Sequence, residues 1–65
     1  MTDREYVEKN MYFSRSVNGH WVANFTCADG YAYSVGADGT ARVAKPIAKR
    51  MLIEKVLVAG RPIQA

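Results

Sequence analysis

The side chains best suited to chemistry in this sequence are a single cysteine, a single histidine, and a set of aromatic and cationic residues. Cys27 and His20 would form a nucleophile pair if they met, because an imidazole can activate a thiol. The strand register that we expect places them on opposite faces and at opposite ends of one strand, and it also separates His20 from Ser14 and Ser16. We therefore expect Cys27 to be a small buried residue and His20 to be exposed beside a turn.

Other catalytic and ligand-binding patterns are weak. One histidine and one cysteine give no cluster with metal-ligand spacing, and Asp29 and Asp38 are explained by the turns that they begin. The GxxG spacing of residues 36–39 falls across an expected hairpin, so it does not predict a phosphate-binding loop. A chain of 65 residues has little room for a substrate pocket. We expect a non-enzymatic protein with no cofactor and no bound metal.

Aromatic and cationic residues predict a different kind of site. Rings beside cations on an open sheet suit the stacking of unpaired bases, with the cations contacting phosphates. The expected sheet places three rings on one face, interleaved with cationic and amide side chains. Alternatively, this face is buried in a dimer interface or under a second core layer. The candidate nucleic-acid-binding residues are Phe13, Arg15, Tyr31, Tyr33, Arg42, Lys45, Lys49 and Arg50.

Charge is distributed unevenly along the chain. Residues 1–40 hold three Arg or Lys against five Asp or Glu, whereas residues 41–65 hold six Arg or Lys against Glu54 alone. A basic surface of this kind suggests a polyanionic partner. The alternative is an ordinary solvated helix surface.

Three dipeptides organise the elements that must position these residues: Asn18-Gly19, Asp29-Gly30 and Asp38-Gly39. Asn or Asp followed by Gly favours two-residue hairpin loops of type I′, which need positive φ at both central residues. They predict four strands in an antiparallel up-and-down meander. These strands are about Met11–Val17, His20–Cys27, Tyr31–Ala37 and Thr40–Val43.

Counting outward from two-residue loops fixes the expected register. Arg15 would face Val22, and Phe25 would lie beside Ser34. A one-residue bulge would exchange the two faces locally. The expected core face carries Tyr12, Trp21, Ala23, Phe25, Cys27, Ala32, Ala41 and Val43.

The C-terminal segment predicts one helix. Pro46 suits the first helical position, and Gly60 suits a left-handed C-cap. Ile53 and Leu57 would fall outside the core stripe and form a second contact surface. An alternative is a short helix followed by a strand through Ile63. The core stripe would comprise Ile47, Ala48, Met51, Leu52, Val56, Val58 and Ala59.

The predicted fold is a single α+β domain over residues 1–65, a four-stranded antiparallel β-meander followed by one C-terminal helix packed on one sheet face. Residues 1–10 would be a flexible arm or a short helical turn, since Thr2 to Glu5 match a capping box. The element order from Met11 to Ala59 is similar to that of single-strand-binding modules of the PUR type. That resemblance implies dimerisation and single-stranded nucleic acid as the ligand.

Size and composition set the remaining expectations. A chain this short buries only about 60% of its unfolded surface, and a lone Cys27 cannot close an internal disulfide, so we expect a homodimer. No apolar run approaches the ~20 residues of a bilayer span. The charged first ten residues lack a signal-peptide core, and a lone thiol suits a reducing compartment, so we expect a cytoplasmic protein.

These observations favour a small basic module that binds single-stranded nucleic acid through its helix region and aromatic sheet face. The alternative is a small protein-binding regulator or inhibitor, of the kind found in phages and mobile elements. It would act through surplus apolar surface, which includes Ile53 and Leu57.

Overall fold

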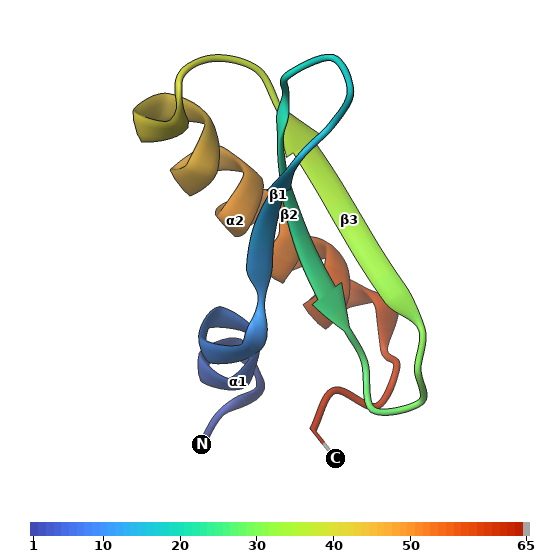
Figure 1. Ribbon diagram of the computed structural model, residues 1–65. Helices are drawn as coiled ribbons and strands as arrows, with labels where there is room; N and C mark the ends of the chain where they lie inside the picture. The colour runs from blue at the N-terminus through green and yellow to red at the C-terminus, as the bar shows by residue number, and fades with distance from the viewer. Residues whose placement is uncertain (65) are drawn as a thin grey trace.

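The chain folds into a three-stranded antiparallel sheet and two helices (Figure 1). The structure is a computed structural model that describes residues 1–64. The strands lie in the order β1-β2-β3, so β2 is central and β1 and β3 are the edges. The fold is α+β with an antiparallel sheet, but the predicted order of four strands and one helix is wrong. The elements are α1 (Asp3–Asn10), β1 (Tyr12–Arg15), β2 (Trp21–Thr26), β3 (Ala32–Ala37) and α2 (Ala41–Ala59).

The first segment is a helix of two turns rather than a flexible arm. The hydroxyl of Thr2 accepts a hydrogen bond from the backbone N–H of Glu5 at 3.2 Å, and the Thr2 N–H donates to the Glu5 carboxylate at 3.1 Å. This is the capping box that the sequence predicts. The hydrogen bonds from the Thr2 backbone and hydroxyl lower the pKa of Glu5, since they stabilise its charged form.

Both hairpins have three-residue loops, not the predicted two-residue loops. The Ser16 N–H donates to the carbonyl of His20, and the Cys27 N–H donates to the carbonyl of Tyr31, which leaves residues 17–19 and 28–30 as loops. Gly19 and Gly30, the last residue of each loop, have φ of 81° and 89°. No non-glycine among residues 1–64 has a positive φ, so neither turn is of type I′.

The extra loop residue shifts the register of both outer strands by one. Arg15 pairs with Trp21 instead of Val22, and Phe25 pairs with Tyr33 instead of Ser34. A one-residue shift moves every side chain of a strand to the other face. The predicted faces are therefore right for β2 and wrong for β1 and β3. The face toward α2 carries Phe13, Arg15, Trp21, Ala23, Phe25, Tyr33, Val35 and Ala37.

The segment predicted as a fourth strand is the first turn of α2. Thr40 is the N-cap residue, and its carbonyl accepts hydrogen bonds from the N–H groups of Val43 and Ala44. Asp38-Gly39 therefore forms the bend between β3 and α2 and not a hairpin. With three strands, the chain no longer has the element order on which the resemblance to PUR-type modules was based.

The long helix contains Pro46 in its interior and ends where the sequence predicts. Gly60 is a C-cap with φ of 76°, and residues 60–64 form no strand, so the alternative of a final strand is wrong. Pro46 is the sixth residue of α2 and is exposed. Because proline has no N–H, the Arg42 carbonyl lacks its usual helical donor.

The core lies between the sheet and the two helices. α2 packs on β2 and β3, and α1 packs against α2. Tyr6 of α1 meets Phe25 edge-on, with ring centres 6.2 Å apart. Ile53, predicted to be a surface residue, is buried in the core that α1 helps to close, a helix contact that the sequence did not predict. The core residues are Val7, Ala23, Phe25, Cys27, Ala48, Leu52, Ile53, Val56 and Ile63.

The apolar stripe of α2 is split between core and surface. Ile47, Met51, Val58 and Ala59, predicted to face the core, are exposed. None of the helices formed by residues 1–64 has the length and apolar character that a membrane crossing requires.

Candidate nucleic-acid interface

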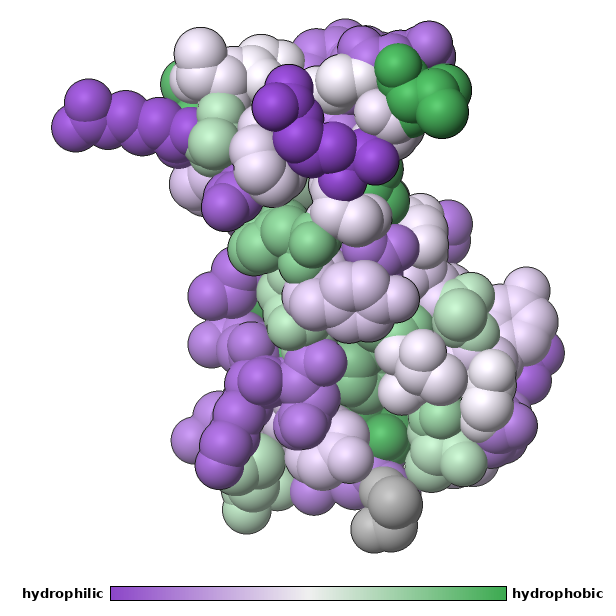
Figure 2. Space-filling view, in the orientation of Figure 1, coloured by the Kyte–Doolittle hydropathy of each residue, from purple (hydrophilic) through white to green (hydrophobic). Residues whose placement is uncertain are grey.

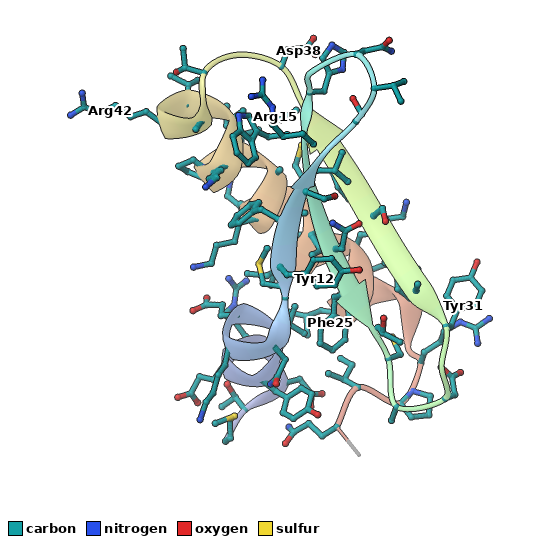
Figure 3. All side chains as sticks on the ribbon, viewed as in Figure 1. Tyr12, Arg15, Phe25, Tyr31, Asp38 and Arg42 are labelled. Carbon is teal, nitrogen blue, oxygen red and sulfur yellow. The ribbon has the colours of Figure 1, made fainter. Side chains whose placement is uncertain are left out.

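The end of β1, the start of β2 and the first half of α2 meet at one end of the molecule. The register places Arg15, the last residue of β1, opposite Trp21, the first residue of β2. Both side chains point to the helix side of the sheet, where Lys45 of α2 approaches them. In Figure 3, Arg15 lies beside the strands at this end, and Arg42 projects outward from the first turn of α2.

Two cations contact the indole ring at the centre of this site. Lys45 Nζ lies 4.4 Å from the Trp21 ring centre and 5.4 Å from that of Phe13. The guanidinium carbon of Arg15 lies 5.0 Å from the Trp21 ring centre, and Arg15 also donates to the carbonyl of Gly19 at 3.1 Å. Cation–π contacts at these distances hold the basic groups in place without neutralising them.

Further cations extend the site along α2. Arg42, Lys45 and Lys49 are spaced three and four residues apart, which places them on one side of the helix, whereas Arg50 lies further round the helix, three residues after Ile47. Hydrophilic surface follows the margin where α2 lies (Figure 2). We call Arg15, Arg42, Lys45, Lys49 and Arg50 the basic cluster.

No member of the basic cluster has a carboxylate within 4.0 Å among residues 1–64. The two ion pairs of that part of the chain lie elsewhere: His20 contacts Asp38 at 3.0 Å, and Arg61 contacts Asp29 at 2.8 Å. The first turn of α2 also lacks an acidic residue, so nothing there offsets the positive end of the helix dipole. The site therefore presents positive charge that no carboxylate of residues 1–64 neutralises by direct contact.

The predicted stacking face is not formed. Phe13 and Tyr33 face α2 and are half-buried against the core, while Tyr31 lies in an exposed position beside the second hairpin loop. Tyr31 and Tyr33 contact each other with ring centres 4.9 Å apart, on β3 and its approach, away from the basic cluster. The correction follows directly from the one-residue register shift. Of the predicted rings, only Phe13 lies at the site.

The open face of the sheet is polar and internally bonded. Asn24, at its centre, donates to Ser14 Oγ at 2.9 Å and accepts from Ser34 Oγ at 2.8 Å, so one hydrogen-bonded row crosses all three strands. Tyr12 is the exposed ring on this face, and it lies over the strands toward the viewer in Figure 3. A single ring beside a satisfied amide does not provide the platform that successive bases need.

A second cation–aromatic contact lies at the opposite end of the molecule and fixes the position of Arg61, which follows α2. Arg61 lies over the Tyr31 ring, with its guanidinium carbon 3.9 Å from the ring centre, and binds Asp29. The N–H of Tyr31 and the Arg61 guanidinium lower the pKa of Asp29, and Asp29 in turn raises the pKa of Arg61. Because its charge is already matched, Arg61 is not part of the basic cluster.

The remaining chemical groups do not assemble into a site. Cys27 is buried, as predicted, and burial raises the pKa of its thiol. It lies just beyond the end of β2, whereas His20 lies just before the start of that strand. Within residues 1–64, no group of three or more His, Cys, Asp or Glu residues could hold a metal ion.

An apolar groove of about 450 Å³ lies on the other side of α2, against β3. Met51, Glu54 and Val58 of the helix and Tyr33 of the strand are among the residues that line it. Arg42, Lys45 and Lys49 thus lie on the opposite side of the helix from the groove, whereas Arg50, four residues before Glu54, lies between the two.

Sequence reasoning missed Trp21, the residue that organises the basic cluster. If the first hairpin loop had been predicted with three residues instead of two, the register would have paired Trp21 with Arg15. Comparisons with protein-family models, with curated proteins and with solved structures found no match.

Proposed function

We propose that the protein binds nucleic acid through the basic cluster, by contacts to backbone phosphates. The observation that carries this proposal is a group of five cations, arranged around Trp21 and along the first half of α2, with no carboxylate partner among residues 1–64. Cations that neutralise phosphates release condensed counterions, and this release favours binding.

The geometry favours recognition of the backbone over recognition of bases. Trp21 and Phe13 are half-buried beneath Lys45, so their faces are not offered to unpaired bases. An interface made of cations alone responds to charge density, which is higher for a duplex than for a single strand. We therefore expect sequence-independent binding that prefers a duplex to a single strand of equal length.

The proposal is tested with a variant that removes charge but leaves the Trp21 contacts in place. Arg42, Lys49 and Arg50 are changed together to Gln, while Arg15 and Lys45 are kept. The matched control changes Arg4, Lys9 and Lys55 to Gln, which removes the same charge from three exposed cations outside the cluster. Binding is followed by fluorescence anisotropy of a labelled duplex of about 12 base pairs, roughly 40 Å long.

The cluster variant should lose at least about tenfold in affinity at low salt, and its slope of log K against log salt should fall by about 1 for each lost phosphate contact. The control should keep most of its affinity and its salt slope. Equal losses in both variants would show that only net charge matters and would contradict a localised site. If the native protein bound a single strand more tightly than a duplex of equal length, this result would contradict recognition of the phosphate backbone.

A protein-binding regulator is the second candidate function. It was predicted from Ile53, Leu57 and the second sheet face, but Ile53 is buried, which leaves Leu57 as the exposed one of the two helix residues. What still favours protein contact is a different surface, the exposed apolar side of α2 next to β3. The homodimer expected from the size of the chain would use this kind of surface and would leave the basic cluster accessible.

A further inference from the structure

The strand β3 is an edge that carries none of the features that usually prevent strand pairing. Its six residues, Ala32–Ala37, include no charged residue and no proline. Its pairing with β2 runs without interruption from Trp21 opposite Ala37 to Thr26 opposite Ala32, so no bulge twists it away. Natural edge strands that stay unpaired usually carry one of these protections.

The backbone of β3 has hydrogen-bonding groups that point outward. The Cys27 N–H donates to the Tyr31 carbonyl, and hydrogen-bonded pairs alternate along an antiparallel ladder. The pairs at Tyr33 and Val35 therefore face β2, whereas the N–H and carbonyl groups of Ala32, Ser34 and Gly36 face away from it. None of the backbone hydrogen bonds formed outside the regular elements of residues 1–64 involves these three residues.

Exposed apolar residues line one side of α2, whose last turns reach the β3 side of the sheet (Figure 1). Val43, Ile47, Met51 and Val58 are exposed on α2, and Val58 keeps 87% of its surface accessible. Spacings of four, four and seven residues place them along one side of the helix. Met51 and Val58 line the same groove as Tyr33, so the lower part of this stripe borders β3. We call these four residues and the outward edge of β3 the β3-side surface.

The surface fits a second copy of the same chain. A two-fold axis perpendicular to the sheet beside β3 would pair β3 with its copy in the antiparallel direction and keep both α2 helices on the same face. Such a contact is self-complementary, as a two-fold interface must be. It would join two three-stranded sheets into one of six strands and remove the exposed edge.

The spacing of the elements supports this arrangement. α2 packs on both β2 and β3, so where it crosses them its axis lies between these strands. With strands about 4.8 Å apart, the two α2 axes would be about 10 Å apart there. Packed helices are separated by roughly 8–10 Å, so the apolar side chains of the two copies would meet and fill the groove beside Tyr33.

We infer that the protein forms a two-fold symmetric homodimer through its β3-side surface, by antiparallel pairing of β3 with its copy and contact between the apolar sides of the two α2 helices. Apart from Arg50, which follows Ile47 by three residues, the basic cluster lies outside this interface, and the inference does not rest on nucleic-acid binding. The test is made without nucleic acid, so failure of one proposal leaves the other standing.

The first measurement is mass by light scattering and sedimentation over a range of protein concentrations. The native chain should have twice the monomer mass, and Val58→Glu should shift the equilibrium to monomer. Val17→Glu is the matched control, because Val17 is a fully exposed valine in the first hairpin loop, outside both β3 and α2. The control should remain a dimer. Circular dichroism should show that both variants keep the native helix content.

The second measurement is hydrogen exchange at single residues. In the dimer, the amides of Ala32, Ser34 and Gly36 should exchange at least about tenfold more slowly than in Val58→Glu, because pairing supplies the acceptors that one chain lacks. A monomeric native protein would overturn the inference. So would a dimer in which these three amides exchange equally fast in both proteins, since its interface would lie elsewhere.

Discussion

Lys45 Nζ of α2 lies 4.4 Å from the centre of the Trp21 ring, which places a cation of the helix directly on the first residue of the central strand. This contact joins the two elements that build the basic cluster. It depends on both corrections to the predicted fold: the one-residue register shift that turns Arg15 toward Trp21, and the helical start of residues 41–45.

Replacing Lys45 should therefore affect stability as well as binding. Lys45→Gln removes cation–π contacts to Trp21 and Phe13, and we expect the free energy of unfolding to fall by about 1 kcal/mol. The single tryptophan should also change its emission, because its charged neighbour is lost. Urea unfolding followed by fluorescence measures both effects.

Lys49→Gln serves as the control for this prediction, since Lys49 makes no cation–π contact among residues 1–64. Its unfolding free energy should change by less than about 0.5 kcal/mol. Equal effects of the two substitutions would mean that the Lys45–Trp21 contact does not stabilise the fold.

The docking of α1 on α2 can be tested at Ile53 and Leu57, which the sequence placed together on the surface. Ile53 is buried and Leu57 is exposed. Ile53→Ala should lower the free energy of unfolding by about 3 kcal/mol, because it leaves a cavity in the core. Leu57→Ala should cost less than about 1 kcal/mol. Chemical denaturation gives both values, and similar losses would contradict the packing described for α1.

Local signals in the sequence predicted local structure well. The capping box from Thr2 to Glu5 and the C-cap at Gly60 are confirmed, because each depends on a few neighbouring residues and a specific backbone geometry. Asn18-Gly19 and Asp29-Gly30 do mark hairpins. The burial of Cys27 was also predicted correctly.

The strand register and the first residue of α2 were predicted wrongly, and both errors have a physical reason. An Asn-Gly pair occurs both in two-residue loops and in three-residue loops that end in a left-handed glycine, and one residue decides which face each ring takes. The sequence predicts Pro46 at the first helical position, because a proline inside a helix removes a hydrogen bond and clashes with the carbonyl four residues before it, yet Pro46 is the sixth residue of α2. All five residues of the basic cluster are among the predicted binding residues. The role of Trp21 and the position of Tyr31 and Tyr33 away from these cations were not predicted.

Acid should weaken the link between Asp29 and Arg61. The Tyr31 N–H and the Arg61 guanidinium lower the pKa of Asp29 from its ordinary value of 3.8. A carboxyl whose pKa is lower in the folded state contributes stability above its unfolded pKa, and this contribution is lost as the pH falls through the lowered value. The unfolding free energy of the native chain should therefore drop below about pH 4.

Asp29→Asn removes this titration, so its stability should depend less on pH between about 5 and 2 than that of the native chain. Thermal unfolding over this range measures the difference. The control Glu8→Gln changes an acid of α1 that forms no ion pair among residues 1–64, and it should follow the native pH dependence. If the curves of Asp29→Asn and the native chain run parallel, the Asp29–Arg61 link has no effect on stability.

The three-residue loops can be tested by comparing two glycines. Gly30 has φ of 89°, and a Cβ built there would meet no atom within 4 Å, so Gly30→Ala should be destabilised by backbone strain alone, by about 1 kcal/mol. Gly36 lies in β3 with an ordinary φ, and a Cβ there would meet the Trp21 carbonyl oxygen at 3.8 Å, a normal contact. Gly36→Ala should leave stability unchanged or raise it by up to about 1 kcal/mol, since alanine has less freedom in the unfolded chain. Urea unfolding of both variants measures the contrast, and a Gly30→Ala protein as stable as Gly36→Ala would mean that the loop does not need a left-handed residue and that the register of β3 is set in another way.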